Sequence, residues 1–227
     1  MFRKPRALDE VECRVLGSLL EKEQSTPEYY PLTIAALVAA VNQKTNREPV
    51  MALEPDDVQG ALDRLFHDVL VWRSPGARSI KWSHNLDRRW GLIPATKAAI
   101  TLLLLRGEQT AGEIRGRAER LHPFASIDEA EAALHLLAEG DEPLVELLPR
   151  AAGQKESRWR HLVAVEPDHT GSAGAAESAT AASPERSVEP PSAPAAHPAV
   201  PLAERLERLE ERVAALEATV RRLSSTG

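Results

Sequence analysis

The chain has 227 residues, of which 43% are hydrophobic and 27% charged, and its formal net charge is −6 at pH 7. This length suits one or two domains. The acidic balance excludes a surface that is basic throughout, so binding to nucleic acid would need a local patch. One cysteine, Cys13, excludes an intrachain disulfide framework and a cysteine-based zinc site. No run approaches the roughly 20 apolar residues of a membrane span, and no apolar signal segment follows the basic N-terminus, so we expect a cytoplasmic protein without membrane contact.

Three helices are predicted before residue 70. Asp9 is a suitable N-cap for a helix over 9–23, and Thr33 is a suitable N-cap for a second helix. Pro55 fits the first position of a third helix, where a missing N–H costs nothing. The polar turn NQKTNREP at 42–49 separates the second helix from the third.

A hairpin follows, and then the whole order of elements recurs. Segments 70–73 and 80–83 flank the turn SPGA and predict two antiparallel strands. The second set comprises helices over 95–106, 110–121 and 127–139, the last with the capping-box pattern Ser126-x-x-Glu129, and a hairpin from 144–148 and 158–162. We interpret the recurrence as an internal repeat, in which Leu62 and Leu65 match Leu134 and Leu137.

Three helices and a hairpin make up a winged helix. The predicted fold class is therefore mainly α with small β-hairpins (α+β), with two tandem winged-helix domains over 1–92 and 93–166.

Four separated stretches of the chain resemble the YceH-like family of uncharacterised bacterial proteins. They are NQKTNREPV at 42–50, ARSIKWSH at 77–84, LLLRGEQTAGEIRGRAERLHPF at 103–124 and LVELLPRAAGQKESRWRHL at 144–162. The resemblance covers residues 8–165 and implies two winged-helix domains. It implies no activity, substrate or cofactor, and therefore no site residues.

The composition changes abruptly at residue 167. Of the 35 residues in 167–201, 10 are Ala, 7 Pro and 5 Ser. Such a stretch buries too little apolar surface to offset the entropy lost on ordering. We therefore predict a disordered linker over 167–201.

Residues 202–227 predict a coiled-coil helix. Apolar side chains alternate spacings of four and three at Leu202, Leu206, Leu209, Val213, Leu216, Val220 and Leu223. Valine at heptad position a with leucine at d favours a parallel two-stranded coil, and Arg205 and Arg212 meet Glu210 and Glu217 of a partner only in that orientation. We expect a homodimer through this segment. The alternative is a single amphipathic helix docked on its own domain.

The sequence shows no catalytic constellation. Its seven histidines lack metal-ligand spacing, and the glycines at 107, 112 and 116 lack the strand–loop–helix context of a phosphate loop. We therefore expect no enzyme, no metal and no cofactor.

The third helix of a winged helix usually reads the major groove, but here it is acidic. Residues 54–68 contain five acidic residues and one arginine, and residues 126–139 contain four acidic residues and no Lys or Arg. Because affinity for DNA comes mainly from neutralising phosphates, we do not expect docking through either helix.

Basic residues gather instead in the turn, on the hairpins and on the fifth helix. The predicted nucleic-acid contacts are Lys44, Arg47, Arg73, Arg78, Lys81, Arg115, Arg117, Arg150, Lys155 and Arg158, with Arg88, Arg89 and Arg120 also basic. Basic hairpins with tryptophans suit contact with a backbone or a minor groove. The alternative is ordinary packing, with tryptophans on the inner hairpin faces and cations on the outer faces. In the turn, asparagines would then cap backbone groups, and Arg47 would pair with Glu48 or a neighbour.

Two functions agree with these patterns. The first is a nucleic-acid-associated regulatory factor, a dimer that contacts the DNA backbone through basic wings and turns. The second is a protein–protein interaction module that uses its acidic third helices and does not bind DNA.

Overall fold

The computed structural model of the chain describes residues 5–76, 79–150 and 153–164. Within these ranges the fold is mixed α+β, with seven α-helices, one short 3₁₀ helix and two small antiparallel sheets. No helix in these ranges is both long and apolar enough to cross a membrane. The predicted linker, the predicted coiled coil and Arg78 lie outside the described residues.

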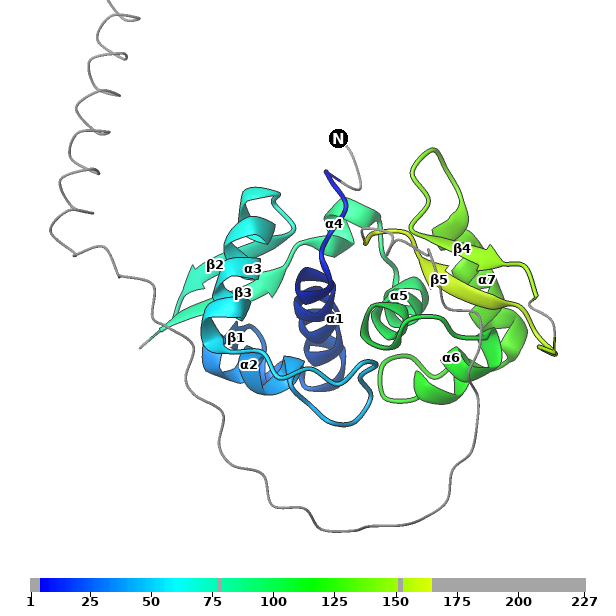
Figure 1. Ribbon diagram of the computed structural model, residues 1–227, viewed down its shortest axis with the longest axis horizontal. Helices are drawn as coiled ribbons and strands as arrows, with labels where there is room; N and C mark the ends of the chain where they lie inside the picture. The colour runs from blue at the N-terminus through cyan, green and yellow to red at the C-terminus, as the bar shows by residue number, and fades with distance from the viewer. Residues whose placement is uncertain (1–4, 77–78, 151–152, 165–227) are drawn as a thin grey trace, which may run out of the picture. The chain divides into compact units, whose positions relative to one another are not determined.

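The elements follow in two sets along the chain (Figure 1). The first set is α1 (Glu10–Ser25), η1 (Pro27–Tyr29), β1 (Leu32–Thr33), α2 (Ile34–Val41), α3 (Pro55–His67), β2 (Val71–Pro75) and β3 (Ile80–His84). After α4 (Leu86–Trp90), the second set is α5 (Pro94–Arg106), α6 (Ala111–Arg117), α7 (Ile127–Ala138), β4 (Val145–Leu148) and β5 (Arg158–His161).

Helix starts in the first set follow the predicted caps. The Asp9 carboxylate accepts the Glu12 N–H at 2.8 Å and the Glu12 carboxylate accepts the Asp9 N–H at 2.9 Å, which forms a capping box. The Thr33 hydroxyl accepts the Ala36 N–H, and Pro55 is the first residue of α3. These predictions are confirmed because capping depends on residues that are close in sequence.

The last helix begins differently from its prediction. The Ser126 hydroxyl accepts the Glu129 N–H as expected, but the Glu129 carboxylate accepts the N–H of Ala125 at 2.6 Å. It also lies 3.4 Å from His122. The predicted capping box is therefore only half formed, because the glutamate reaches one residue further back.

The two hairpins are built alike. β3 lies between β1 and β2, and Leu32 of β1 pairs with Trp82. In the second set, Gln109 makes an isolated antiparallel bridge with Trp159 of β5. Both tryptophans are 3% exposed. Each hairpin therefore gains a third extended segment from the residue that precedes the second helix of its set.

The entry into each hairpin is also the same. The N–H of Leu70 donates to the carbonyl of Leu65, and the N–H of Leu144 donates to the carbonyl of Leu137, both at 2.9 Å. These bonds close corresponding turns after α3 and α7. The order of three helices and a hairpin thus recurs with equivalent contacts, and we call the two copies the first and second repeat.

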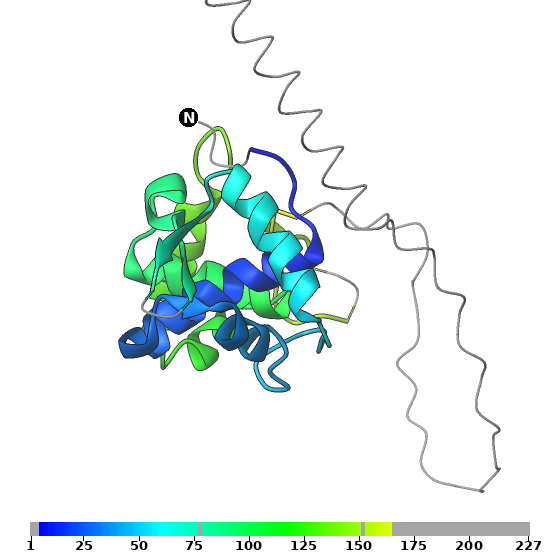
Figure 2. The same ribbon diagram turned by 90° about the vertical axis from the view of Figure 1, so that its left-hand side faces the viewer.

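One hydrophobic core runs through both repeats. α1 and α5 lie side by side at the centre, with α3 and its hairpin on one flank and α7 and its hairpin on the other (Figure 1). Turned by 90°, the first repeat stands in front of the second (Figure 2). Gly17 makes this close packing possible, because a Cβ at that position would lie 2.8 Å from the Leu105 side chain. The predicted boundary after residue 92 therefore marks a recurrence of elements and not a break in the packing.

Three details differ from the sequence-based expectations. α6 ends at Arg117, four residues before the predicted end, and the unpredicted α4 joins the repeats. Trp72 is 46% exposed, because its register pairs it with Ser83 on the face of the hairpin away from Trp82. Phe66 is 38% exposed and meets Trp82 edge-on at the border of the core.

Candidate functional site

The first hairpin presents only part of its predicted basic set to solvent. Arg73 is exposed, and its guanidinium lies 4.7 Å above the ring of Phe66. Lys81 lies half-buried on the opposite face, in register with Ser74. The two cations therefore point to different faces and do not form a single surface.

Two predicted cations of the second repeat, Arg117 and Arg158, are hydrogen-bonded to polar groups of the same repeat. Arg158 donates to the Glu113 carboxylate and to the Glu108 carbonyl, both at 2.9 Å. Arg117 donates to Gln109 at 2.7 Å and to Glu113 at 3.2 Å. Burial would raise the pKa of Glu113, but the Thr110 N–H and the two arginines outweigh it and lower that pKa. Arg158 is thus largely committed to holding α6 against the hairpin.

The remaining predicted cations of this repeat are exposed. Arg115 donates to the Ala125 carbonyl and Arg150 to the Lys155 carbonyl, each at 3.4 Å. Bonds of this length to a single neutral acceptor leave most of each guanidinium facing solvent. These side chains are therefore still able to meet a phosphate.

Arg47 is a buried structural residue. It is 2% exposed, and its guanidinium binds the Glu21 carboxylate through two bonds of 2.7 and 3.1 Å. It also donates to the Ala40 carbonyl. Burial would raise the pKa of Glu21, but the hydrogen bonds from Arg47 outweigh it and lower that pKa. Arg47 therefore pairs with an acid, as in the structural alternative, but the partner is Glu21 of α1 and not the adjacent Glu48.

Other groups of the turn form hydrogen bonds with the backbone of neighbouring segments. Asn42 exchanges two hydrogen bonds of 2.8 Å with the backbone of Leu53, and the N–H of Glu48 donates to the carbonyl of Leu105 at the end of α5. The turn therefore connects the first repeat to α5. This leaves Lys44 as its exposed cation.

Lys44 and Arg117, one from each repeat, line the same pocket. This pocket has a volume of about 560 Å³ and lies between the end of α1, the turn before α3 and the end of α6. The turn and the α6 region approach each other at the lower side of the coloured ribbon in Figure 1. Lys22 and Arg120 complete its set of four cations. We call it the basic pocket.

The charge balance of the basic pocket is positive. Glu21 is its one acidic lining residue, and Glu21 is already bound by Arg47, with Lys22 at 3.1 Å. Lys44 and Arg120 are exposed and make no hydrogen bond or ion pair with other described residues. Sequence reasoning did not select Lys22 or Arg120 for this set, because nothing local places α1 and α6 beside the turn.

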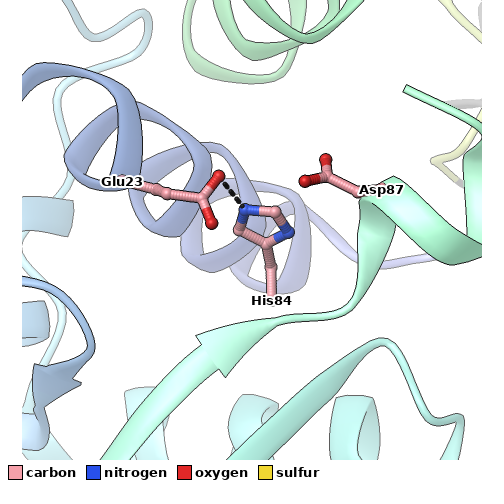
Figure 3. A group of neighbouring side chains, drawn as sticks. All are labelled: Glu23, His84 and Asp87. Atoms are coloured by element: carbon pink, nitrogen blue, oxygen red, sulfur yellow. Dashed lines mark hydrogen bonds and ion pairs between the residues drawn. The ribbon is translucent and has the colours of Figure 1, made fainter. Parts of the chain in front are cut away.

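A second candidate is a group of metal-type ligands. Glu23, His84 and Asp87 each offer one ligand atom, and these atoms lie within 4.8 Å of one another. Figure 3 shows Glu23 bonded to His84, with the Asp87 carboxylate turned towards them. The group joins α1, β3 and α4.

The details of this group do not fit a metal ion. The Lys97 ammonium lies 2.7 Å from Glu23 and 2.6 Å from Asp87, so a cation already bridges the two carboxylates. The Leu86 N–H donates to Nδ1 of His84, which places the imidazole proton on Nε2, where it is donated to Glu23. His84 therefore has no free lone pair for a metal. Burial would raise the pKa of Glu23, but His84 and Lys97 lower it to about 2. The group is an ion-pair network that ties the two repeats together.

The acidic helices face solvent as expected. On α3 the side chains of Asp56, Asp57 and Asp63 are exposed, and on α7 those of Asp128 and Glu131 are exposed. Arg64, the one basic residue of α3 besides His67, bonds Asp9 and Glu12 at 2.7 Å. Neither helix therefore offers a free cation to a DNA groove.

Comparison with known proteins places the chain in a family. The family model described as "Protein of unknown function, DUF480" matches residues 8–154. The chain belongs to this DUF480 family. A UPF0502 protein of Geobacter sulfurreducens is 52% identical over 162 residues, which are 71% of this chain and 74% of the relative. A UPF0502 protein of Chromobacterium violaceum is 50% identical over 70% of this chain and 74% of its own.

Another DUF480-family relative extends the match to nearly the whole chain. A UPF0502 protein of Acidovorax sp. is 45% identical over 224 residues, which are 97% of this chain and 94% of the relative. Membership of the family confirms the resemblance noted from the four motifs.

Proposed function

We propose that this protein is a nucleic-acid-associated regulatory factor made of two winged-helix units, and that it contacts the phosphate backbone through the basic pocket. The observation that carries this proposal is the meeting of Lys22, Lys44, Arg117 and Arg120 around one pocket of about 560 Å³. Two of these cations have no partner among the described residues, so their charge is free to neutralise phosphates.

The location of the pocket supports backbone contact over groove reading. The cations come from the C-terminal end of α1, the turn before α3, the last residue of α6 and the segment just after it, and not from the acidic α3 and α7. Backbone contacts position a protein on nucleic acid but do not read sequence. Binding should therefore be strong at low salt and nearly independent of base sequence.

The test is a salt titration with random duplex and single-stranded DNA, followed by fluorescence anisotropy of a labelled strand. Lys44→Glu and Arg120→Glu should each weaken binding roughly tenfold near 0.1 M salt and flatten the slope of log K against log salt by about 1, because each lost phosphate contact releases fewer counterions. Arg88→Glu is the matched control, since Arg88 is an exposed arginine on α4 with the same change in charge.

The wings are tested separately. If the first hairpin also contacts the DNA backbone, the triple variant Arg73→Glu, Arg78→Glu, Lys81→Glu should weaken DNA binding relative to the unaltered chain. Absence of binding by the unaltered full-length chain to both kinds of DNA at low salt would refute the proposal.

A specific surface favours the second function, a protein–protein interaction module. The exposed acids of α3 belong to the same repeat as exposed apolar side chains, Phe66 and Ile80 on the Trp82 side of the first hairpin, Trp72 on its other side, and Val69 before β2. Apolar side chains exposed together with charged ones are typical of a protein interface. Reversal of Asp56, Asp57 and Asp63 to Lys should then abolish recovery of a partner in pull-down experiments but leave DNA binding intact or stronger.

A further inference from the structure

A second pocket lies at the junction of the two repeats, away from the basic pocket. It has a volume of about 480 Å³ and is lined by residues of α1, the turn before α3, the end of α5 and the end of β5. Its apolar wall comes from Leu8, Cys13 and Leu104, which are 2 to 5% exposed. Ligand pockets of this size are commonly apolar, contain a few placed polar groups, and lie where structural units meet.

The polar group inside this pocket is Arg14. It is 2% exposed, and its guanidinium donates to the carbonyls of Val41 at 3.4 Å and Pro49 at 2.6 Å. Its Nε is buried and has no hydrogen-bond partner, and no carboxylate lies within ion-pair distance among the described residues. Buried charges in proteins are normally paired, because removing a charge from water is costly. Arg14 is therefore a cation without its usual counter-ion.

A second unsatisfied nitrogen belongs to the same pocket. Nδ1 of His161 is buried and lacks a partner in the described part of the chain. Burial, with a smaller effect of Arg160, lowers the pKa of His161 to about 4. The ring is therefore neutral at pH 7, and it can donate or accept a hydrogen bond without adding charge.

The rim of the pocket has the opposite charge. Glu10 and Glu48 are exposed lining residues, and Glu10 stands one helical turn before Arg14. Residues at this spacing are neighbours on a helix surface, yet Arg14 points inward and makes no ion pair with Glu10. The pocket thus combines a buried cation, an apolar wall and carboxylates at its mouth.

We propose that this pocket binds a small zwitterion with an apolar body, the chemistry of an apolar α-amino acid. Its carboxylate meets Arg14, its ammonium group meets Glu10 and Glu48, and its side chain lies against Leu8 and Leu104. A simple anion would leave the rim carboxylates unpaired and repelled, and a simple cation would leave Arg14 unpaired. The inference is independent of nucleic-acid binding, which its test does not involve.

The test is isothermal titration of the full-length protein with three molecules that share one apolar body. These are L-leucine, 4-methylpentanoate, which lacks the ammonium group, and 3-methylbutylamine, which lacks the carboxylate. L-Leucine should bind at least tenfold more tightly than either analogue. Equal binding of L-leucine and an analogue would overturn the proposal, as would failure of L-leucine, L-isoleucine, L-valine, L-methionine and L-phenylalanine to bind.

Variants assign the contacts. Arg14→Gln should weaken L-leucine binding more than tenfold, with thermal unfolding confirming that it is folded. The double variant Glu10→Gln, Glu48→Gln alters only exposed side chains. It should weaken the binding of L-leucine several-fold without weakening the binding of 4-methylpentanoate. The control Glu119→Gln, at an exposed acid elsewhere, should change the binding of neither. If Arg14→Gln does not fold, the rim variants decide, and an unchanged affinity for L-leucine in them refutes the proposal.

Cys13 gives a readout that needs no substitution. It is the only cysteine of the chain and lines the pocket. Saturating L-leucine should slow alkylation of its thiol several-fold, while the same concentration of 3-methylbutylamine should not. An alkylation rate unchanged by L-leucine would contradict occupancy of this pocket.

Discussion

At the scale of single residues, burial differs between basic side chains that look equivalent in the sequence. Lys44 and Arg47 stand three positions apart in one polar turn, yet Lys44 is exposed and Arg47 is enclosed against Glu21 of α1. The sequence allowed an acid partner for Arg47 but could not identify Glu21, because their contact joins residues 26 positions apart. For the same reason it gave no sign that Arg14 lies in a pocket.

Arg47→Met should destabilise the protein by ~3–5 kcal/mol, because it leaves the Glu21 carboxylate buried without its partner. Urea denaturation followed by circular dichroism measures this loss. Lys44→Met is the matched control, and as an exposed substitution it should stay within about 0.5 kcal/mol. Equal effects of the two variants would show that the buried ion pair contributes nothing.

Stability should fall on acidification in two stages. Burial lowers the pKa of His161 from 6.5 to about 4, so between these values the unfolded chain takes up a proton that the folded chain does not, and the free energy of unfolding falls as pH drops. Glu12 and Glu23 act at lower pH. Burial would raise the Glu12 pKa, but hydrogen bonds from Arg6, Asp9 and Arg64 lower it to about 2, as His84 and Lys97 do for Glu23.

The stabilisation from the two glutamates is full above their ordinary pKa of 4.5 and is lost as pH falls towards 2. Each group changes the free energy of unfolding by up to ~1.4 kcal/mol per pH unit within its window. Urea denaturation from pH 7 to pH 3 should show both stages. His161→Gln should remove the first stage and leave the second, and retention of both stages would contradict this assignment.

At the scale of elements, sequence prediction succeeded where the signal is local. The caps at Asp9 and Thr33 placed the starts of α1 and α2 within a residue, and the predicted ranges 95–106 and 127–139 lie within one residue of α5 and α7. The packing of α1 along α5 was not predictable, since helical periodicity gives a buried face but not its partner. α5 is apolar on nearly all sides because it lies between α1 and α7.

The approach of α1 to α5 can be tested at Gly17. Alanine favours a helix over glycine by about 1 kcal/mol, but a Cβ at Gly17 would lie 2.8 Å from Leu105 and 3.1 Å from Leu104. Gly17→Ala should therefore destabilise the protein by a net ~1–3 kcal/mol. Gly60→Ala on α3, where the nearest atom is the end of the Arg64 side chain at 3.6 Å, should stabilise it by ~0.5–1 kcal/mol. Stabilisation by both substitutions in urea denaturation would show that the helices do not approach so closely.

At the scale of the whole molecule, the heptad pattern of residues 202–227 predicts a parallel dimer, and this segment lies outside the described residues. Light scattering of the full-length chain should give twice the 24.8 kDa of one chain. Leu209→Glu with Leu216→Glu should give a monomer, because charges at heptad d positions oppose pairing. Ala214→Glu with Ala215→Glu, at outward positions, should remain dimeric. A monomeric unaltered chain would rule out self-association through this segment.

The shared core also bears on the predicted division into domains. α1 packs against α3 of its own repeat and α5 of the next, and the ion-pair network around Lys97 crosses the same junction. A recurrence in sequence indicates copied elements, but it does not reveal whether each copy encloses its own core. We therefore expect residues 8–164 to unfold in one transition.

The two ends of the region from Leu8 to Ala164 touch. Leu8 and Ala164 form a parallel bridge, and the N–H of Leu8 donates to the carbonyl of Val163 at 2.8 Å. During synthesis on the ribosome, the N–H of Leu8 can therefore find this partner only after Val163 has been made. The same closure makes residues 8–164 a natural subject for circular permutation, in which a short peptide joins Ala164 to Leu8 and new ends are opened in the turn between β2 and β3.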